Sequence, residues 1–202
     1  VGANIDDVAE GMRYDPRIGA KFLKAGVGYG GSCFPKDTKA LTFLARQHGI
    51  TLKTVDAAVE INAAQKTKLF EKAKKRLMTF ENMKVAVLGL AFKPGTDDLC
   101  EAASLDNVSL LLDHGAVLSC YDPVAGANFA KKYPNVTLAA SIEEALTGAF
   151  CCFVFTEWDE IVRLSPETFR RTMRVPLVYD GRNIFDPDNM KRAGVEYYSI
   201  GR

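Results

Sequence analysis

Apolar residues recur at helical spacing in the first eighty residues. A helix is expected over Asn4–Met12, with Asn4 able to cap its first turn. A second amphipathic run covers Pro35–Gln47, and a third covers Leu52–Met78. The apolar positions of the third run predict one stripe that packs on the preceding helices: Val55, Val59, Ala63, Phe70, Ala73 and Leu77. We expect residues 1–80 to form a central helical region.

After a turn at 79–82 the pattern changes to short apolar runs that alternate with amphipathic ones. Lys84–Phe92 is almost wholly apolar, as a strand covered on both faces of a parallel sheet must be. Further strands are predicted at Val117–Tyr121, Thr137–Ala139, Phe150–Phe155, Leu177–Asp180 and Glu196–Ser199. Helices are predicted between them at Ser104–His114, Asn128–Tyr133, Ile142–Leu146, Trp158–Leu164, Pro166–Met173 and Pro187–Arg192. This repetition predicts an α/β fold in which residues 81–202 form a Rossmann-like, doubly wound parallel sheet.

The composition narrows the class of protein. The 202 residues are 48% hydrophobic and carry a net charge of +1, which gives no reason to expect a nucleic-acid partner. The basic run between Lys66 and Arg76 is interpreted as the solvated face of a helix, and Ala149–Phe155 is too short to cross a membrane. Five scattered cysteines and two histidines predict neither a metal site nor disulfides, so a cytoplasmic setting is expected.

Candidate chemistry gathers in the segment Gly26–Asp37. Four glycines in six residues allow its backbone to lie close to a ligand. Cys33 then falls at the start of a predicted helix, where unpaired N–H groups and the charges of Lys36 and Lys39 should lower the pKa of its thiol. Its thiolate is a candidate nucleophile, although a cysteine in such a turn is more often a small buried residue. Asp37 is placed to orient water or accept a proton.

The glycines also satisfy the pattern G-x-G-x-x-G, which is typical of dinucleotide-binding folds. That pattern has meaning only between a buried strand and a helix. Ile18–Ala25 is too basic and irregular for a buried strand, and no acidic residue ends a second strand. We therefore do not interpret these glycines as a dinucleotide site.

Three segments resemble the UDP-glucose/GDP-mannose dehydrogenase family. Phe22–Asp37 resembles its active-site segment. Gly89–Asp98, which reads Gly-Leu-Ala-Phe-Lys-Pro-Gly-Thr-Asp-Asp, and Tyr179–Arg182 resemble its UDP-binding domain. The resemblance implies an NAD-dependent enzyme that oxidises UDP-glucose to UDP-glucuronate by two hydride transfers. It also implies that a cysteine forms a thiohemiacetal and then a thioester with the sugar.

The resemblance also implies roles for single residues. Cys33 and Asp37 are expected to be catalytic, and Cys33 and Lys36 are expected to face the cofactor. Residues expected to bind the UDP-sugar are Lys24, Gly26, Tyr29, Gly30, Phe92, Lys93 and Arg182. Arg17 matches an arginine that reaches the substrate of a neighbouring subunit, which implies a homodimer or a larger assembly.

The chain departs from the family at Cys100. Relatives usually have an arginine there that approaches NAD, and a neutral thiol cannot replace a guanidinium with five donors. Cofactor affinity is expected to be weaker, or this contact is made elsewhere. The family's NAD-binding domain is expected upstream of Val1, as are a lysine and an asparagine that assist catalysis, so we expect these 202 residues to be inactive alone.

Two other functions stay open from the sequence. The chain is a non-catalytic nucleotide-sugar-binding or assembly module if Cys33 is an unreactive thiol. It performs the same chemistry on GDP-mannose or a UDP-N-acetylhexosamine if its sugar pocket differs. Ser32 and Phe34, which flank Cys33, favour UDP-glucose by resemblance.

Overall fold

A computed structural model describes residues 2–202, so Val1, the first residue of the predicted helical region, lies outside the described residues. Six parallel strands form one sheet in the order β3-β2-β1-β4-β5-β6. They are β1 (Lys84–Leu88), β2 (Val117–Tyr121), β3 (Thr137–Leu138), β4 (Cys151–Val154), β5 (Leu177–Asp180) and β6 (Glu196–Tyr198). From β1 the chain adds strands first towards one edge of the sheet, as β2 and β3, and then towards the other edge, as β4, β5 and β6. This reversal of strand order between β1 and β4 is typical of a doubly wound fold. The predicted fold class is confirmed.

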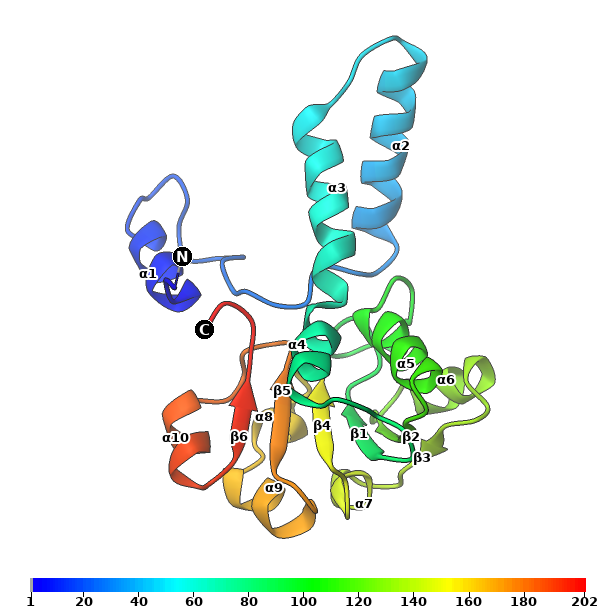
Figure 1. The fold of residues 1–202 in the computed structure, drawn as a ribbon. Helices are drawn as coiled ribbons and strands as arrows, with labels where there is room; N and C mark the ends of the chain where they lie inside the picture. Colours follow the sequence, from blue (N-terminus) through cyan, green and yellow to red (C-terminus); the bar gives the residue numbers. More distant parts are fainter. Residues whose placement is uncertain (1) are drawn as a thin grey trace.

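Helices cover both faces of the sheet (Figure 1). One face carries α4 (Lys68–Arg76), α5 (Ala103–Asp113) and α6 (Gly126–Lys132). The other carries α7 (Ile142–Leu146), α8 (Asp159–Val162), α9 (Pro166–Thr172) and α10 (Pro187–Arg192). Because neighbouring strand residues point to opposite faces, each central strand must be apolar throughout.

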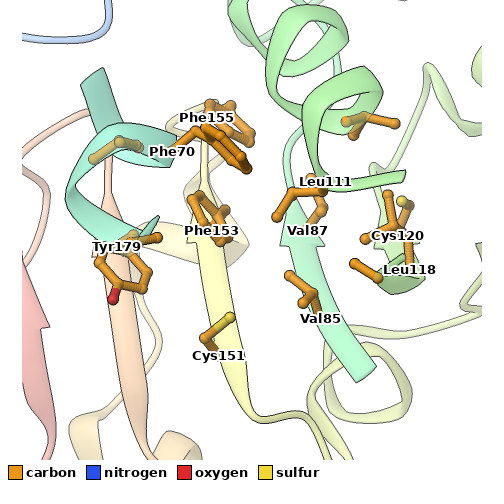
Figure 2. Packing of buried hydrophobic residues seen from close by; sticks show 14 of the residues in the cluster. Phe70, Val85, Val87, Leu111, Leu118, Cys120, Cys151, Phe153, Phe155 and Tyr179 are labelled. Carbon is orange, nitrogen blue, oxygen red and sulfur yellow. The ribbon is translucent and has the colours of Figure 1, made fainter. Parts of the chain in front are cut away.

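The alternation in β1 illustrates how the strands serve two cores. Val85 and Val87 belong to the core beneath α4 and α5, while Ala86 and Leu88 belong to the opposite core. Figure 2 shows the first core, in which Phe70 of α4 and Leu111 of α5 lie over the strands.

Three further helices precede the sheet: α1 (Ile5–Arg13), α2 (Cys33–Gln47) and α3 (Lys53–Lys66). The α2–α3 pair forms a long hairpin that projects above the edge at which the strands end (Figure 1). Helix α1 lies beside the C-terminus, where the Ile5 N–H donates to the Gly201 carbonyl at 2.8 Å. An ion pair of 2.6 Å joins Arg202 to Asp6.

Three predictions about the third helical run are wrong. The run is divided at Thr67 into α3 and α4, and Leu69, Phe70 and Ala73 of α4 are buried in the sheet core rather than against the preceding helices. Lys66 is only 7% exposed, so it does not belong to a solvated face. Burial on the sheet removes these apolar side chains from water, which stabilises this packing.

The first strand is also shorter than predicted. It ends at Leu88, because Gly89 takes a φ of +79° and a Cβ there would lie 2.5 Å from the Cβ of Thr156. The remaining strands and helices of residues 81–202 lie where predicted, with ends that differ by a few residues. Among the described residues no helix has both the length and the apolar character needed to cross a bilayer.

Candidate active site

Two buried carboxylates shape the loops at the carboxyl ends of the strands. Asp122, which follows β2, accepts the N–H groups of Leu90 and Ala91 at 2.7 and 3.1 Å and the indole N–H of Trp158 at 3.0 Å. Asp180, the last residue of β5, is fully buried and accepts three backbone N–H groups of its own loop and the Tyr197 hydroxyl. Buried carboxylates with this many donors fix loop conformation strongly.

The glycine-rich loop lies directly on these strand-end loops. The Val27 N–H donates to the Gly181 carbonyl at 3.0 Å, beyond β5, and the Gly31 N–H donates to the Cys100 carbonyl at 2.7 Å, beyond β1. Segments that are distant in sequence thus meet above the sheet, on either side of the point between β1 and β4 where the strand order reverses. Doubly wound folds bind ligands at this position.

Absence of a side chain is what allows this approach. A Cβ at Gly30 would lie 2.5 Å from the Glu101 carbonyl oxygen, and one at Gly31 would lie 2.7 Å from the ring of Phe92. A Cβ at Gly26 would lie 3.1 Å from the Gly181 carbonyl oxygen. The predicted role of Gly26 and Gly30 as ligand contacts is untested. A side chain at Gly30 would force the Glu101 backbone to move, whereas one at Gly26 would meet a tight contact only.

Helix α3 holds the same loop from its other side. The side-chain amide of Asn62 accepts the Tyr29 N–H at 2.7 Å and donates to the Tyr29 carbonyl at 3.1 Å. Gln65 donates to the Gly26 carbonyl at 2.8 Å. Neither amide was predicted from the sequence, since polar residues on a helix usually face water. Their spacing of three residues, which places them on one helix face, is the only signal that was available.

Cys33 is the first residue of α2, and its side chain is exposed. Ser32 precedes it and makes no side-chain hydrogen bond to the helix, so its hydroxyl does not satisfy the backbone N–H groups of the first turn, near the thiol. Asp37 is exposed and pairs with Lys36, 3.4 Å from carboxylate to ammonium. Within residues 2–202 no hydrogen bond joins Cys33 to Asp37, so the predicted assistance by Asp37 is untested.

Phe92 and Lys93 lie together beyond β1. The Lys93 ammonium sits 5.3 Å from the centre of the Phe92 ring, a cation–π contact, and the ring itself covers Gly31. Phe92, which is expected to bind the UDP-sugar, is therefore adjacent to the segment that leads into Cys33.

Arg182, beyond β5, is already bound to a carboxylate. Its Nε and NH2 groups donate to the two oxygens of Glu157 at 2.6 and 2.7 Å. The remaining NH1 group lies near Gly26, whose Cβ would be 3.4 Å away. Glu157 was not singled out in the sequence, because its position after β4 alone does not distinguish a partner from a solvated acid.

Three other predicted site residues make no contact in the structure that tests their roles. Arg17 is 88% exposed and pairs with its own neighbour, Asp15, at 2.6 Å. Lys24 is exposed. Tyr29 is half-buried and its ring contacts that of Phe34 edge-on, with 5.9 Å between the ring centres. The roles predicted for Arg17, Lys24 and Tyr29 stay predictions.

A cavity of about 850 Å³ lies beside the loop that follows β1. Cys100 is one of its lining residues, together with Glu101, Lys66 and Tyr133. Phe92, Lys93 and Arg182 do not line it, so the cavity is separate from the predicted sugar-nucleotide contacts. Among the described residues no cluster of histidine, cysteine or acidic side chains has the arrangement of a metal site.

The sheet itself does not form a dinucleotide site. In dinucleotide-binding folds an acidic residue at the end of β2 accepts hydrogen bonds from a ribose. Asp122 occupies that position here, directly after β2, so the expectation that no acidic residue ends a second strand is wrong. Its carboxylate is already occupied, because it accepts hydrogen bonds from Leu90, Ala91, Val124, Ala125 and Trp158. These residues therefore do not fit a whole NAD molecule, although Cys33, Lys36 and Cys100 are exposed and able to border one.

Together these features define a doubly wound α/β protein with a glycine-rich, cysteine-bearing loop seated on its ligand edge. Family models agree: residues 86–187 match the UDP binding domain of the UDP-glucose/GDP-mannose dehydrogenase family, and residues 1–64 match its central domain. The chain belongs to the UDP-glucose/GDP-mannose dehydrogenase family, a family of oxidoreductases. The resemblance seen in the sequence is confirmed.

Relatives with curated functions match over the whole chain. It is 41% identical to UDP-glucose 6-dehydrogenase YwqF of Bacillus subtilis and 43% identical to UDP-glucose 6-dehydrogenase of Pseudomonas aeruginosa, covering 100% of this chain and 46% of each relative. The chain thus spans about half the length of the curated relatives it matches.

Solved structures share the fold. A UDP-glucose dehydrogenase from Pyrobaculum islandicum superposes with a TM-score of 0.86 at 29% identity, over 99% of this chain and 44% of the other. The UDP-D-ManNAc dehydrogenase of Pyrococcus horikoshii gives 0.78 at 26% identity, over 100% and 45%. The predicted boundary between the helical and sheet regions near residue 80 falls between the two family models and stays a prediction.

Proposed function

We propose that this chain is part of an NAD-dependent UDP-glucose 6-dehydrogenase, in which Cys33 is the nucleophile. One observation carries the proposal. The loop that ends in Cys33 is hydrogen-bonded to the loops of Phe92 and Arg182, so a nucleotide sugar bound at the strand ends meets a thiol at a helix start. The curated relatives, which are UDP-glucose 6-dehydrogenases, support this substrate.

Each group has a role that its chemistry supports. NH1 of Arg182 and the Lys93 ammonium supply positive charge for the diphosphate, and the Phe92 ring supplies a wall for the sugar. Lys24 and Tyr29, on the same segment as Gly26, are proposed to complete the substrate contacts.

The covalent chemistry takes place on the sulfur of Cys33. Loss of a hydride and a proton from the C6 alcohol, with NAD as the hydride acceptor, first gives an aldehyde. The thiolate attacks this aldehyde, so a carbon–sulfur bond forms and the oxygen takes a proton to give a thiohemiacetal. Loss of a hydride from that carbon and of its hydroxyl proton, with NAD as the hydride acceptor, then gives a thioester. Water, oriented by Asp37, then adds to the carbonyl, the carbon–sulfur bond breaks, and uronate leaves while the thiol is restored.

NAD supplies the electron acceptor, because oxidising an alcohol to a carboxylate removes two hydrides. Since the described sheet does not fit a whole dinucleotide, we propose that a domain outside this sequence holds it, with Cys33, Lys36 and Cys100 at the border. The enzyme is then active only as the longer protein, in which the two ligands meet between domains.

We also propose a homodimer or larger assembly in which Arg17 reaches a neighbouring site. Arg17 is exposed, and exposed apolar side chains on the projecting hairpin support contact with another chain: Leu41, Phe43, Leu44 and Ile61. A cytoplasmic location is proposed because the five cysteines are free thiols, as a reducing compartment keeps them.

The sugar is the main alternative. UDP-D-ManNAc dehydrogenase of Pyrococcus horikoshii has the same fold, so a UDP-N-acetylhexosamine or GDP-mannose is the second candidate substrate. Parallel assays with UDP-glucose, UDP-ManNAc and GDP-mannose separate these candidates. A non-catalytic module would bind UDP-glucose without reducing NAD in the longer protein.

The test is Cys33→Ala in the longer protein. Uronate formation should fall by about 10³-fold or more, since removing a nucleophile removes the covalent route. The dissociation constant for UDP should stay within about twofold, since Cys33 lies outside the strand-end loops. Undiminished uronate formation would refute the role of Cys33.

A further inference from the structure

Glu101 joins the projecting hairpin to the sheet. Its carboxylate accepts the Lys39 ammonium of α2 at 2.8 Å through one oxygen and the Lys66 ammonium of α3 at 2.8 Å through the other. Glu101 itself lies in the loop between β1 and α5. One side chain therefore ties three elements together.

The backbone at this position is held as tightly as the side chain. Glu101 has a φ of +51°, in the left-handed region that long side chains rarely occupy. The carbonyl before it, that of Cys100, accepts the Gly31 N–H at 2.7 Å, and its own carbonyl lies against Gly30. An unfavourable conformation of this kind persists where the surroundings determine it.

Burial makes the Lys66 half of the contact strong. The Lys66 side chain is 8% exposed, and its nearest acidic neighbour after Glu101 is Asp106, whose carboxylate is 3.9 Å from the ammonium. A buried ammonium needs a close opposite charge, and removing its partner is far more costly than removing a surface pair. Hydrogen bonds from Lys39 and then Lys66 lower the pKa of Glu101 to about 2, so its carboxylate is ionised at neutral pH.

The anchored points enclose the candidate nucleophile. Gly31 lies two residues before Cys33, and Lys39 lies six residues after it, within two turns of the same helix. Gly31 bonds to Cys100 and Lys39 bonds to Glu101, so both attachments end on adjacent residues of one loop. Phe92 and Lys93 lie earlier in that loop, and the Phe92 N–H donates to the Asp98 carbonyl at 3.1 Å.

We propose that Glu101 is a positioning residue, which fixes the start of α2 and hence the Cys33 thiol relative to the nucleotide-sugar contacts beyond β1. This proposal rests on the proposed function, because it assigns Glu101 to the same reaction. Glu101 does not touch the sugar in this scheme and acts through Lys39, Lys66 and the neighbouring backbone.

The test in the longer enzyme separates positioning from binding. Glu101→Gln keeps the shape of the side chain and removes its charge, so kcat with UDP-glucose should fall by about 10- to 100-fold, the penalty of a misplacement near 1 Å. The dissociation constant for UDP should change by less than about twofold, because Arg182 is held by Glu157, which Glu101 does not contact. Unchanged kcat would overturn the proposal, and so would a parallel loss of UDP affinity.

Two milder variants guard against misfolding. Lys39→Met removes one arm at an exposed position and leaves the buried Lys66 paired, so kcat should fall by less than in Glu101→Gln. Glu101→Asp keeps the charge and tolerates a positive φ better, so it should recover part of the loss. The matched control is Glu60→Gln, because Glu60 is an exposed acid of α3 without an ion pair in the described part of the chain. Activity of the control should equal that of the wild type, and equal losses in Glu60→Gln and Glu101→Gln would refute a specific role.

A second readout does not depend on the reaction. In the 202-residue chain, amide hydrogen exchange of Gly31 and the first turns of α2 should be at least about fivefold faster in Glu101→Gln, while β1 and β4 stay protected. Unchanged exchange in α2 overturns the positioning role even if the enzyme oxidises UDP-glucose. Faster exchange in a protein that does not oxidise UDP-glucose upholds the anchor and refutes the proposed function.

Discussion

Gly30 offers a quantitative test of how the glycine-rich loop sits on the sheet. Its φ lies outside the left-handed region, so alanine is compatible with the backbone, and any penalty for Gly30→Ala must come from crowding. The new Cβ would lie 2.5 Å from the Glu101 carbonyl oxygen, which must retreat by about 0.9 Å to reach ordinary contact.

That retreat has a defined cost. If the loops separate, the bond from Gly31 to the Cys100 carbonyl stretches from 2.7 Å beyond hydrogen-bonding range, which costs about 1–3 kcal/mol. If they do not separate, overpacking costs a similar ~1–3 kcal/mol. The two costs are alternatives and do not add, so we expect a penalty near 2 kcal/mol from crowding.

Gly126→Ala is the matched control. Gly126 begins α6, and a Cβ there would meet only the Leu138 side chain at 3.8 Å, an ordinary contact. Both changes remove the same freedom from the unfolded chain, so that effect cancels when the variants are compared. Urea denaturation of the two variants should give free energies of unfolding that differ by about 2 kcal/mol. Equal values would refute the close packing of the loop on Glu101.

Three further outcomes are expected. A disulfide reagent at about pH 8 should modify only the exposed Cys33 and Cys100 in the native chain, and all five thiols in urea. The reason is that burial raises the pKa of Cys120 and of Cys151 to about 12. A third reactive thiol in the native chain would contradict the burial of these cysteines in the core. Since the Glu101 pKa is lowered from 4.5 to about 2, its contribution to stability is present above pH 4.5 and is lost as the pH falls towards 2. The urea midpoint should therefore fall more steeply with acid in the wild type than in Glu101→Gln, and equal slopes would disprove the ionic anchor. In the longer enzyme, Cys100→Arg should lower the KM for NAD, and an unchanged KM would remove the proposed cofactor contact.

The strands were predictable because a parallel sheet covered on both faces demands continuous apolar runs. Val85–Leu88 and Cys151–Val154 are such runs, and both are buried throughout. Their order in the sheet follows from the doubly wound pattern. Helix α4 was misplaced because a stripe of apolar positions tells which face is buried but not against what. Phe70 therefore had to be located by the structure.

Some candidate site residues could be predicted from the sequence and others could not. Cys33, Phe92 and Arg182 stand in motifs whose local sequence identifies them. Lys66 and Glu101 have no such signal, because a charged residue on an amphipathic helix or in a loop is solvated in most proteins, and its burial depends on a partner 35 residues away. Asp122 and Asp180 had a usable signal that was not exploited, since each stands at the end of a buried strand.

The ion pairs of this edge explain how it is shaped before a ligand arrives. Glu157 holds Nε and NH2 of Arg182 and leaves NH1 without a hydrogen bond within residues 2–202, near Gly26. A guanidinium held by two of its nitrogens loses little further freedom when the third meets a phosphate, so part of the entropic cost of binding is met during folding. Glu101 likewise restrains the start of α2 before a ligand binds, through its ion pairs with Lys39 and Lys66. Carboxylates that never touch the substrate thus orient the cations and the thiol that do so in the proposed reaction.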